Sequence, residues 1–118
     1  MNLRILTLVA SLLWIVPACR EKATPIPAHV LQPAEMTAIL ADLHEVQAAV
    51  SLRSAKDTSA LKFAAYAPAI FRNHGITAAV YDSSLAYYTL HPVLLDSIYK
   101  SVIDTLSKRQ SEVEGSIH

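Results

Sequence analysis

Glycine is almost missing from this chain of 118 residues, which contains only Gly75 and Gly115. A β-sandwich or β-barrel joins its strands through many tight turns, and such turns depend on glycine. The sequence therefore disfavours a β fold, and its abundant alanine, leucine and serine favour helices. At this length we expect one domain at most.

Cysteine and net charge are scarce as well. The only cysteine, Cys19, has no partner for an internal disulfide and no second thiolate for a zinc site. Ten basic and ten acidic residues cancel, and no basic stripe is visible, so we expect no nucleic-acid partner. If Arg4 is removed with the N-terminal segment, the remaining chain has nine basic and ten acidic residues.

The longest apolar run stands near the N-terminus. Residues 5–16 are uncharged, which matches the core of a signal peptide, and they are too few for a membrane-spanning helix of about 20 residues. The following Val16-Pro17-Ala18-Cys19 resembles the lipobox of bacterial lipoproteins, although Pro17 is looser than the usual small residue. That resemblance implies a signal peptide over residues 1–18, cleavage between Ala18 and Cys19, and a diacylglycerol on Cys19. The alternatives are an ordinary secretory signal and an uncleaved anchor helix.

The residues after Cys19 bear on its location. Asp at the next position tends to retain lipoproteins at the inner membrane, but this chain has Arg20. Residues 20–22 are mixed in charge, unlike the acidic run that directs some lipoproteins to the cell surface. We therefore expect an outer-membrane lipoprotein that faces the periplasm, with the surface-facing leaflet as the alternative.

Residues 19–32 contain the lipidated cysteine and two prolines, Pro25 and Pro27, and are predicted to form a tether. An extended proline-rich segment rises about 3.1 Å per residue, so this one would hold the domain up to roughly 40 Å from the bilayer. The alternative is an ordered arm that packs on the domain through Ile26, Val30 and Leu31.

Residues 33–110 are predicted to form an all-α domain, a small bundle or orthogonal array of about four helices. Pro33 suits the first turn of a helix of about twenty residues. Its apolar side chains recur every three or four residues, as expected for one buried face. They are Met36, Ile39, Leu40, Leu43, Val46 and Val50.

Local signals place the next helix ends. A polar break covers residues 54–59, and Thr58 or Ser59 is expected to cap the second helix. Pro68 should kink or divide that helix, and Gly75 should end it. Thr77 is expected to cap the third helix.

The fourth helix should begin at Pro92, because the residue before a proline is pushed out of the α conformation. Residues 111–118 are predicted to be a frayed polar tail. The apolar stripe of this helix comprises Leu95, Ile98, Tyr99, Val102, Ile103 and Leu106.

Candidate groups for chemistry are few. Asp42, His44 and Glu45 lie close in sequence, but residues two apart on a helix point to different sides, so Asp42 and His44 do not easily share a metal. The histidines are instead expected to cap helices or lie on the surface, although His44 and His91 could meet in space. Ser84 and its neighbour lack a glycine-framed elbow and an obvious base. We therefore expect no catalytic residue, no metal site and no cofactor.

Tyrosines are concentrated in the last two predicted helices. Most should be core or half-buried residues whose hydroxyls reach the surface. The functional alternative is a partner surface formed by His44, Tyr87, Tyr88 and His91, because tyrosine is favoured in interface anchors.

Several short motifs resemble the uncharacterised Bacteroidetes lipoprotein family numbered 4296 among the domains of unknown function. The resemblance implies a small, lipid-anchored helical envelope protein and brings no activity or catalytic residue. The motifs are Ile39-Leu40-Ala41-Asp42-Leu43-His44, His74-Gly75-Ile76-Thr77, Tyr81-Asp82-Ser83-Ser84-Leu85, Tyr87-Tyr88, His91-Pro92, Ile98-Tyr99 and Val102-Ile103.

Three functions follow from these observations as hypotheses. The first is a non-catalytic interaction module, bound to the membrane through acylated Cys19 and to another envelope protein. The second is a carrier of a small ligand or lipid, with an apolar cavity between the second helix and the tyrosines. An enzyme is the least favoured of the three.

Overall fold

The computed structural model of this protein describes residues 25–53 and 56–117. This part of the chain forms four α-helices and no strand, which confirms the all-α prediction. The predicted signal peptide, its cleavage site and Cys19 lie outside the described residues. Among the helices that are described, none has the length and apolar character needed to cross a membrane.

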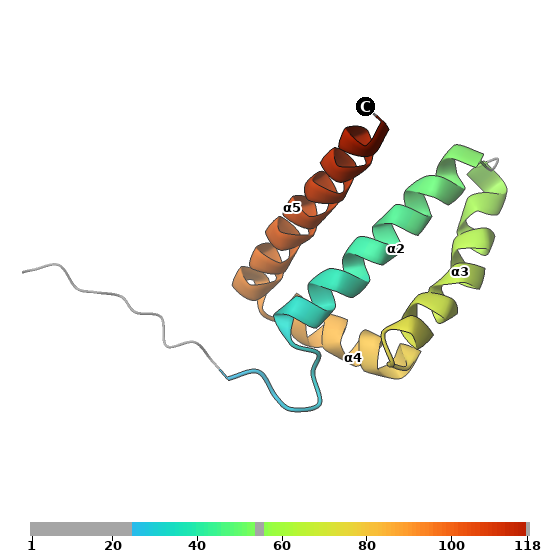
Figure 1. Ribbon diagram of the computed structural model, residues 1–118. Coiled ribbons are helices and arrows are strands. Elements are labelled where there is room, and N and C mark those ends of the chain that lie inside the picture. The colour runs from blue at the N-terminus through green and yellow to red at the C-terminus, as the bar shows by residue number, and fades with distance from the viewer. Residues whose placement is uncertain (1–24, 54–55, 118) are drawn as a thin grey trace, which may run out of the picture.

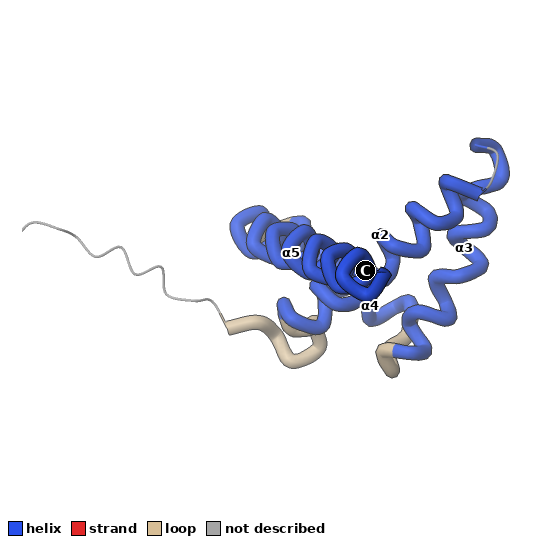
Figure 2. The backbone as a smooth tube through the Cα atoms, turned by 45° about the horizontal axis from the view of Figure 1, so that its top comes forward, coloured by secondary structure: helices blue, strands red, loops and turns tan. Residues whose placement is uncertain are grey.

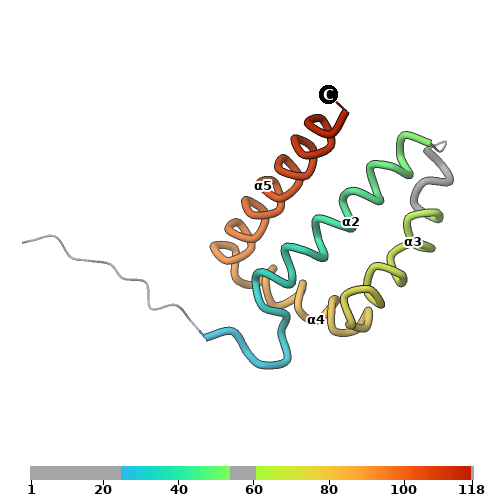
Figure 3. The backbone as a smooth tube through the Cα atoms, in the orientation of Figure 1, coloured from blue at the N-terminus to red at the C-terminus, as the bar shows by residue number. Residues whose placement is uncertain are grey.

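The four helices form an open layer with one crossing helix. They are α2 (Pro33–Arg53), α3 (Lys56–Asn73), α4 (Ala78–Thr89) and α5 (Pro92–Ile117). α2 lies in the middle, with α3 packed on one side and α5 on the other (Figure 1). A view turned by 45° shows the same order (Figure 2). α4 crosses one end of the layer, beside the start of α2, and connects α3 to α5 (Figure 3).

The hydrophobic core gathers around α2. Met36, Ile39, Leu40 and Leu43 are buried there, and Val50 is buried further along, so the predicted apolar face of this helix is confirmed. The other helices and the segment before α2 each add a few buried side chains. These are Val30, Leu31, Ile70, Phe71, Tyr88, Ile98 and Val102.

The predicted apolar stripe of α5 is only half covered. Ile98 and Val102 are buried, but Ile103 is 62% exposed and Tyr99 is 39% exposed. The reason is that α2 is the only described helix running alongside α5, while α4 meets α5 near its start. Tyr99 and Ile103, each one position after a buried residue of α5, therefore remain partly in solvent.

The start and middle of α3 differ from the prediction. The helix begins at Lys56, so Thr58 and Ser59 lie inside it and do not cap it. It also continues across Pro68, so of the two predicted effects of this proline the division is wrong and the kink stays a prediction. Proline removes one backbone donor, but the remaining helix hydrogen bonds and the burial of Phe71 and Ile70 near the end of α3 hold the helix together.

The end of α3 follows the prediction closely. Gly75 adopts a left-handed conformation with φ of 68°. Its N–H donates to the carbonyl of Arg72, and the N–H of Ile76 donates to the carbonyl of Phe71, both at 3.0 Å. This pair of bonds is the Schellman motif, which satisfies the last carbonyls of a helix. Two residues later the Thr77 hydroxyl accepts the Val80 N–H and caps α4, as predicted.

Two predicted boundaries change. Val30 and Leu31 are buried and Ile26 packs against the core, so residues 26–32 are an ordered arm and not part of an extended tether. α5 continues to Ile117, so residues 111–117 are helical and not frayed. The expectation of a polar tail missed that the helical apolar spacing continues through Val113.

Candidate functional site

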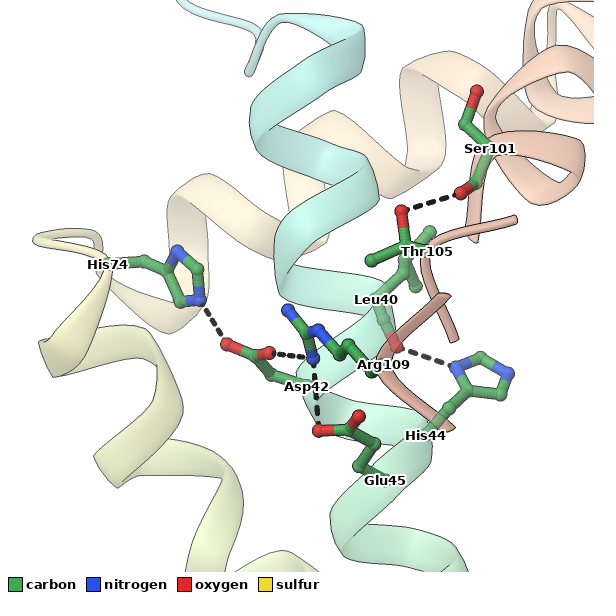
Figure 4. A network of polar contacts seen from close by, with 8 residues as sticks. All are labelled: Leu40, Asp42, His44, Glu45, His74, Ser101, Thr105 and Arg109. Carbon is green, nitrogen blue, oxygen red and sulfur yellow. Dashed lines mark hydrogen bonds and ion pairs between the residues drawn. The ribbon is translucent and has the colours of Figure 1, made fainter. Parts of the chain in front are cut away.

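A polar cluster joins three helices around Asp42 of α2 (Figure 4). The Asp42 Oδ2 accepts a hydrogen bond from Nε2 of His74 at 2.7 Å, and its Oδ1 accepts one from Nη1 of Arg109 at 2.8 Å. The same Arg109 nitrogen lies 3.0 Å from Oε2 of Glu45, three residues further along α2. The cluster therefore ties the end of α3 and the middle of α5 to one point on α2.

The electrostatics of this cluster favour a charged Asp42. Burial alone would raise the pKa of the Asp42 carboxyl, but hydrogen bonds and charges from His74 and Arg109 outweigh burial and lower this pKa below its ordinary value. The hydrogen bond to Asp42 also raises the pKa of Arg109. The side chains of Asp42 and Arg109 are 33% and 37% exposed. Ion pairs this accessible to water contribute about 0.2–1 kcal/mol each, so the cluster mainly orients the helices.

The chemical capacity of the cluster is small. A carboxylate that orients an imidazole is part of a hydrolytic triad, but a triad also needs a hydroxyl or thiol beside the second ring nitrogen. Within residues 25–53 and 56–117, His74 makes no such side-chain contact. The same part of the chain contains no group of three side chains placed to ligate a metal ion. The contact that Asp42 and His74 do make joins α2 to the residue that follows α3.

His44 stands apart from the other residues of the predicted partner surface. Its Nδ1 donates to the Leu40 carbonyl at 2.7 Å, and its ring meets the ring of Tyr99 edge-on, with centroids 6.4 Å apart. Tyr99 follows His91 by eight residues on α5. That separation corresponds to about 12 Å along the helix axis. His44 therefore does not join the group around His91.

Tyr87, Tyr88 and His91 do come together, at the junction of α4 and α5. Tyr87 stacks on His91 with centroids 4.2 Å apart and meets Tyr88 edge-on at 5.4 Å. Tyr88 is 0% exposed, however, so its assignment to a partner surface is wrong and it is a core residue. Tyr87 and His91 are half-buried, and Nδ1 of His91 donates to the Tyr87 carbonyl at 2.7 Å.

Tyr88 holds the arm that precedes α2. Its hydroxyl donates to the carbonyl of Leu31 at 2.6 Å, and the Leu31 N–H donates to Oγ of Ser84 at 3.0 Å. Ser84 in turn donates to the Val80 carbonyl at 2.7 Å. Burial raises the pKa of Tyr88, which keeps its hydroxyl protonated as a donor. We call this arrangement the Leu31 clasp, because two side chains one turn apart on α4 satisfy both backbone polar groups of buried Leu31.

The clasp is the feature that the sequence interpretation missed. Ser84 is fully buried, so its hydroxyl can reach only groups that pack against it. The hydrogen bond to the arm spans 53 residues, and the one from Tyr88 spans 57. Neither the spacing of polar residues nor helix periodicity carries information about contacts at that separation.

An open groove runs between α2 and α3, toward the end of the layer away from α4. Its volume is about 490 Å³, and its lining is mostly apolar with two basic side chains. The predicted carrier cavity was placed near the tyrosines, but only one tyrosine borders this groove. The lining residues are Val46, Ala49, Val50, Arg53, Lys62, Ala65 and Tyr66.

Comparison with known proteins gives one kind of match. No curated protein and no solved structure matches this chain significantly. A family model described as "Domain of unknown function (DUF4296)" matches residues 27–112, from the arm to the last third of α5. The match covers most of the chain and confirms the family suggested by the helix motifs. The chain belongs to the DUF4296 family.

Proposed function

We propose that this protein is a lipid-anchored, non-catalytic interaction module of the bacterial envelope, held on the periplasmic face of the outer membrane by acylated Cys19. The observation that carries this proposal is the lipobox-like Val16-Pro17-Ala18-Cys19 at the end of the uncharged run over residues 5–16. Each buried methylene of an acyl chain contributes about 0.8 kcal/mol, and two chains hold a protein firmly where one holds it reversibly. A diacylated cysteine is therefore a sufficient anchor.

The Leu31 clasp supports a domain held close to a membrane. Because Ile26 already packs on the core, the stretch between Cys19 and the packed arm is residues 20–25. Fully extended, this stretch spans about 20 Å. That is about half the reach expected of a tether over residues 19–32, so the anchored domain would stay within one domain diameter of the bilayer.

Two exposed leucines at the end of the domain away from the arm are candidate contacts for a partner; Leu90 and Val93 are exposed as well, at the junction of α4 and α5. The arm enters beside α4, at the end where α2 begins (Figure 1). Leu52, at the other end of α2, is 88% exposed, and Leu61 on the facing helix is 74% exposed. Exposed apolar side chains that gather into one patch mark interaction sites, and Leu52 and Leu61 are the residues that would form such a patch here. A membrane-held protein would present them away from the bilayer.

The polar side chains support a non-catalytic role. Three candidate groups among the described residues are already engaged with the backbone. The Ser84 hydroxyl bridges Val80 and Leu31, and Nδ1 of both His44 and His91 donates to a carbonyl one turn earlier. Such bonds hold a fold together, and within residues 25–53 and 56–117 they pair none of these three groups as a nucleophile with a base.

The anchor is tested by fractionating cells that produce the full chain or its Cys19→Ser variant. The unmodified chain is expected in the outer-membrane fraction, and the variant is expected to leave it. An Arg20→Ala variant is the matched control, because it changes the neighbouring residue and keeps the acylated cysteine. Equal membrane association of wild type and Cys19→Ser would refute the anchor.

The interaction role is tested separately by placing a photo-crosslinking amino acid at Leu52 in intact cells. The matched control carries the same group at Lys108, an exposed position of α5. A single envelope protein captured from position 52 and not from position 108 is the expected result. Capture of no protein from position 52, or of the same set from both, would refute this surface.

A second candidate function is a carrier of an amphiphilic ligand, favoured by the groove between α2 and α3. A mostly apolar groove of about 490 Å³ bordered by Arg53 and Lys62 suits an acyl chain with an anionic head group. Titration with a fluorescent fatty acid tests this candidate. Binding that saturates at one molecule per chain and weakens in an Arg53→Glu/Lys62→Glu variant would support it, and binding unchanged in that variant would exclude the groove.

A further inference from the structure

One face of α5 carries a regular, mainly apolar stripe that the rest of the described chain covers only in part, at Tyr99 and Leu106. We call it the α5 stripe, and its spacing alternates between four and three residues. That spacing is the heptad pattern of helices that pair with a neighbouring helix. The stripe consists of Tyr99, Ile103, Leu106, Gln110, Val113 and Ile117.

The second half of α5 contacts α2 through Arg109 and the core through Leu106, and its last turns are exposed. Ile98 and Val102 are the buried residues of this helix, whereas Val113 is 60% exposed and Ile117 is 74% exposed. Short isolated helices are marginal in water, and most helical stability in proteins comes from packing of an apolar face. The last turns of α5 therefore need something to cover the stripe.

We infer that a second copy of this chain covers it, through antiparallel pairing of the two α5 helices. In the antiparallel register centred between Ser107 and Arg109, Ile103 of each copy faces Val113 of the other. Tyr99 then faces Ile117, and Leu106 faces Gln110, so each apolar residue of the stripe meets a stripe residue. Tyr99 to Ile117 spans nearly the whole described length of the helix after its first two turns.

Charge complementarity selects this register. Lys100 directly follows the stripe residue Tyr99, and Glu114 directly follows the stripe residue Val113. In the antiparallel register Lys100 of one copy faces Glu114 of the other, and symmetry makes this pair twice. Within one chain, Nζ of Lys100 lies 2.7 Å from Oδ2 of Asp96, one turn earlier on α5. This ion pair is exposed and contributes little, so Lys100 can exchange it for Glu114 of the other copy.

The parallel arrangement lacks this match. There Lys100 would face Leu95, and Glu114 would face Arg109 of the other copy. The Arg109 guanidinium is already bound to Asp42 and Glu45 of its own chain. The antiparallel register also places Arg109 beside Arg109 of the other copy on the opposite flank, where Asp42 and Glu45 of each chain neutralise the guanidinium.

The neighbouring face of α2 leaves room for a second helix. His44 packs against Tyr99 at the edge of the stripe. The residues one and two turns further along α2 are Ala48 and Ser51, which are small and exposed. Two copies paired in this way bring α2 and α5 of each chain together as a four-helix bundle, an arrangement in which every helix covers two others.

The area indicates a weak dimer. An exposed aliphatic or tyrosine side chain offers on the order of 100 Å² of apolar surface, so the four most apolar stripe positions of two copies bury about 800 Å². Stable interfaces bury about 1,200–2,000 Å². We therefore expect a reversible dimer that is populated at high local concentration. This inference stands whether or not Cys19 is acylated.

Cysteine cross-linking of the full chain tests the pairing and its direction. In the antiparallel register Ser107 lies beside Ser107 of the second copy, so Ser107→Cys is expected to form a covalent dimer on oxidation. Val113→Cys would meet itself only in a parallel pair and is expected to stay monomeric. The unsubstituted chain controls for Cys19. Absence of dimer with Ser107→Cys, or stronger dimer with Val113→Cys, overturns the proposal.

Charge reversal provides an independent test by sedimentation equilibrium. Lys100→Glu and Glu114→Lys are each expected to weaken dimerisation roughly three- to tenfold, and the double variant is expected to restore it. Lys108→Glu, on the opposite side of α5, is the matched control and should have no effect. Helical circular dichroism checks that each variant is folded. Failure of the double variant to recover, or an equal effect of Lys108→Glu, overturns the assigned partner residues.

Discussion

Replacing Tyr88 with phenylalanine tests the Leu31 clasp with a change of a single atom. Tyr88 is fully buried and its hydroxyl donates to the Leu31 carbonyl at 2.6 Å. Phenylalanine keeps the ring packing, so the main loss is the hydrogen bond. The substitution leaves the buried Leu31 carbonyl without this partner. That loss costs about 1–3 kcal/mol. The urea midpoint should therefore fall by about 1 M for a domain of this size.

The effect should be concentrated in the arm. Leu31 is the only residue of the arm held by the Tyr88 hydroxyl, and the Val30 N–H donates to the Pro27 carbonyl in the same segment. A loss of about 2 kcal/mol corresponds to a roughly thirtyfold larger equilibrium constant for opening of the arm. Hydrogen exchange of the Val30 and Leu31 amides is the direct readout. Burial of Tyr88 also predicts that its absorbance titrates above the ordinary tyrosine range.

The matched control is Tyr87→Phe on the same helix. Tyr87 is half-buried and stacks through its ring, which phenylalanine preserves. Its unfolding free energy should change by less than about 0.5 kcal/mol. If Tyr88→Phe proves as stable as Tyr87→Phe and the arm amides exchange at the wild-type rate, the clasp does not hold the arm and the reasoning is refuted.

Three further changes have expected outcomes of their own. Gly75→Ala should lower the unfolding free energy by about 1 kcal/mol in urea titrations, because φ is 68° there and a side chain disfavours that conformation. No atom lies within 4 Å of the added Cβ, so a steric clash does not add to the loss. Gly115→Ala lies inside a helix and is the control, which should raise the unfolding free energy. Met36→Ala, at a position with 0% exposure, should cost about 2–5 kcal/mol, and a loss below 1 kcal/mol would contradict the assigned core. The Asp42 carboxyl has a lowered pKa in the folded protein. Its contribution to the unfolding free energy is therefore complete above about pH 4, the ordinary pKa range of an unfolded Asp, and is lost as the pH falls through the folded-state pKa. Asp42→Asn should therefore lower the unfolding free energy at neutral pH and make it fall less steeply as the pH is lowered into the acid range. An unchanged pH dependence in the acid range would contradict the network.

The sequence predicts the parts of this fold that depend on neighbouring residues. Gly75, Thr77 and Pro92 each mark a helix end through the conformation or hydrogen bond of the residue itself, and all three are found where expected. The apolar face of α2 is equally local, because its period is set by helix geometry. Four helices and an all-α class follow from signals of this kind.

The contacts between distant residues could not be predicted in the same way. Asp42 was recognised as a candidate group, but its partner Arg109 lies 67 residues away and gives no sign of the pairing. Tyr88 was predicted to be a core or half-buried residue, with a partner surface as the alternative, because helix periodicity alone does not tell which face the arm will cover. Ile103 was assigned to the core because its stripe is apolar, and the described residues of the chain leave Ile103 62% exposed.

The central claim, that the folded domain is carried by a lipid on Cys19, is tested most directly by the intact mass of the chain extracted from membranes. The account predicts a mature chain that begins at Cys19 and carries the added mass of at least one diacylglycerol, lost in the Cys19→Ser variant. A chain that retains residues 1–18, or one that begins elsewhere without added lipid mass, would contradict it.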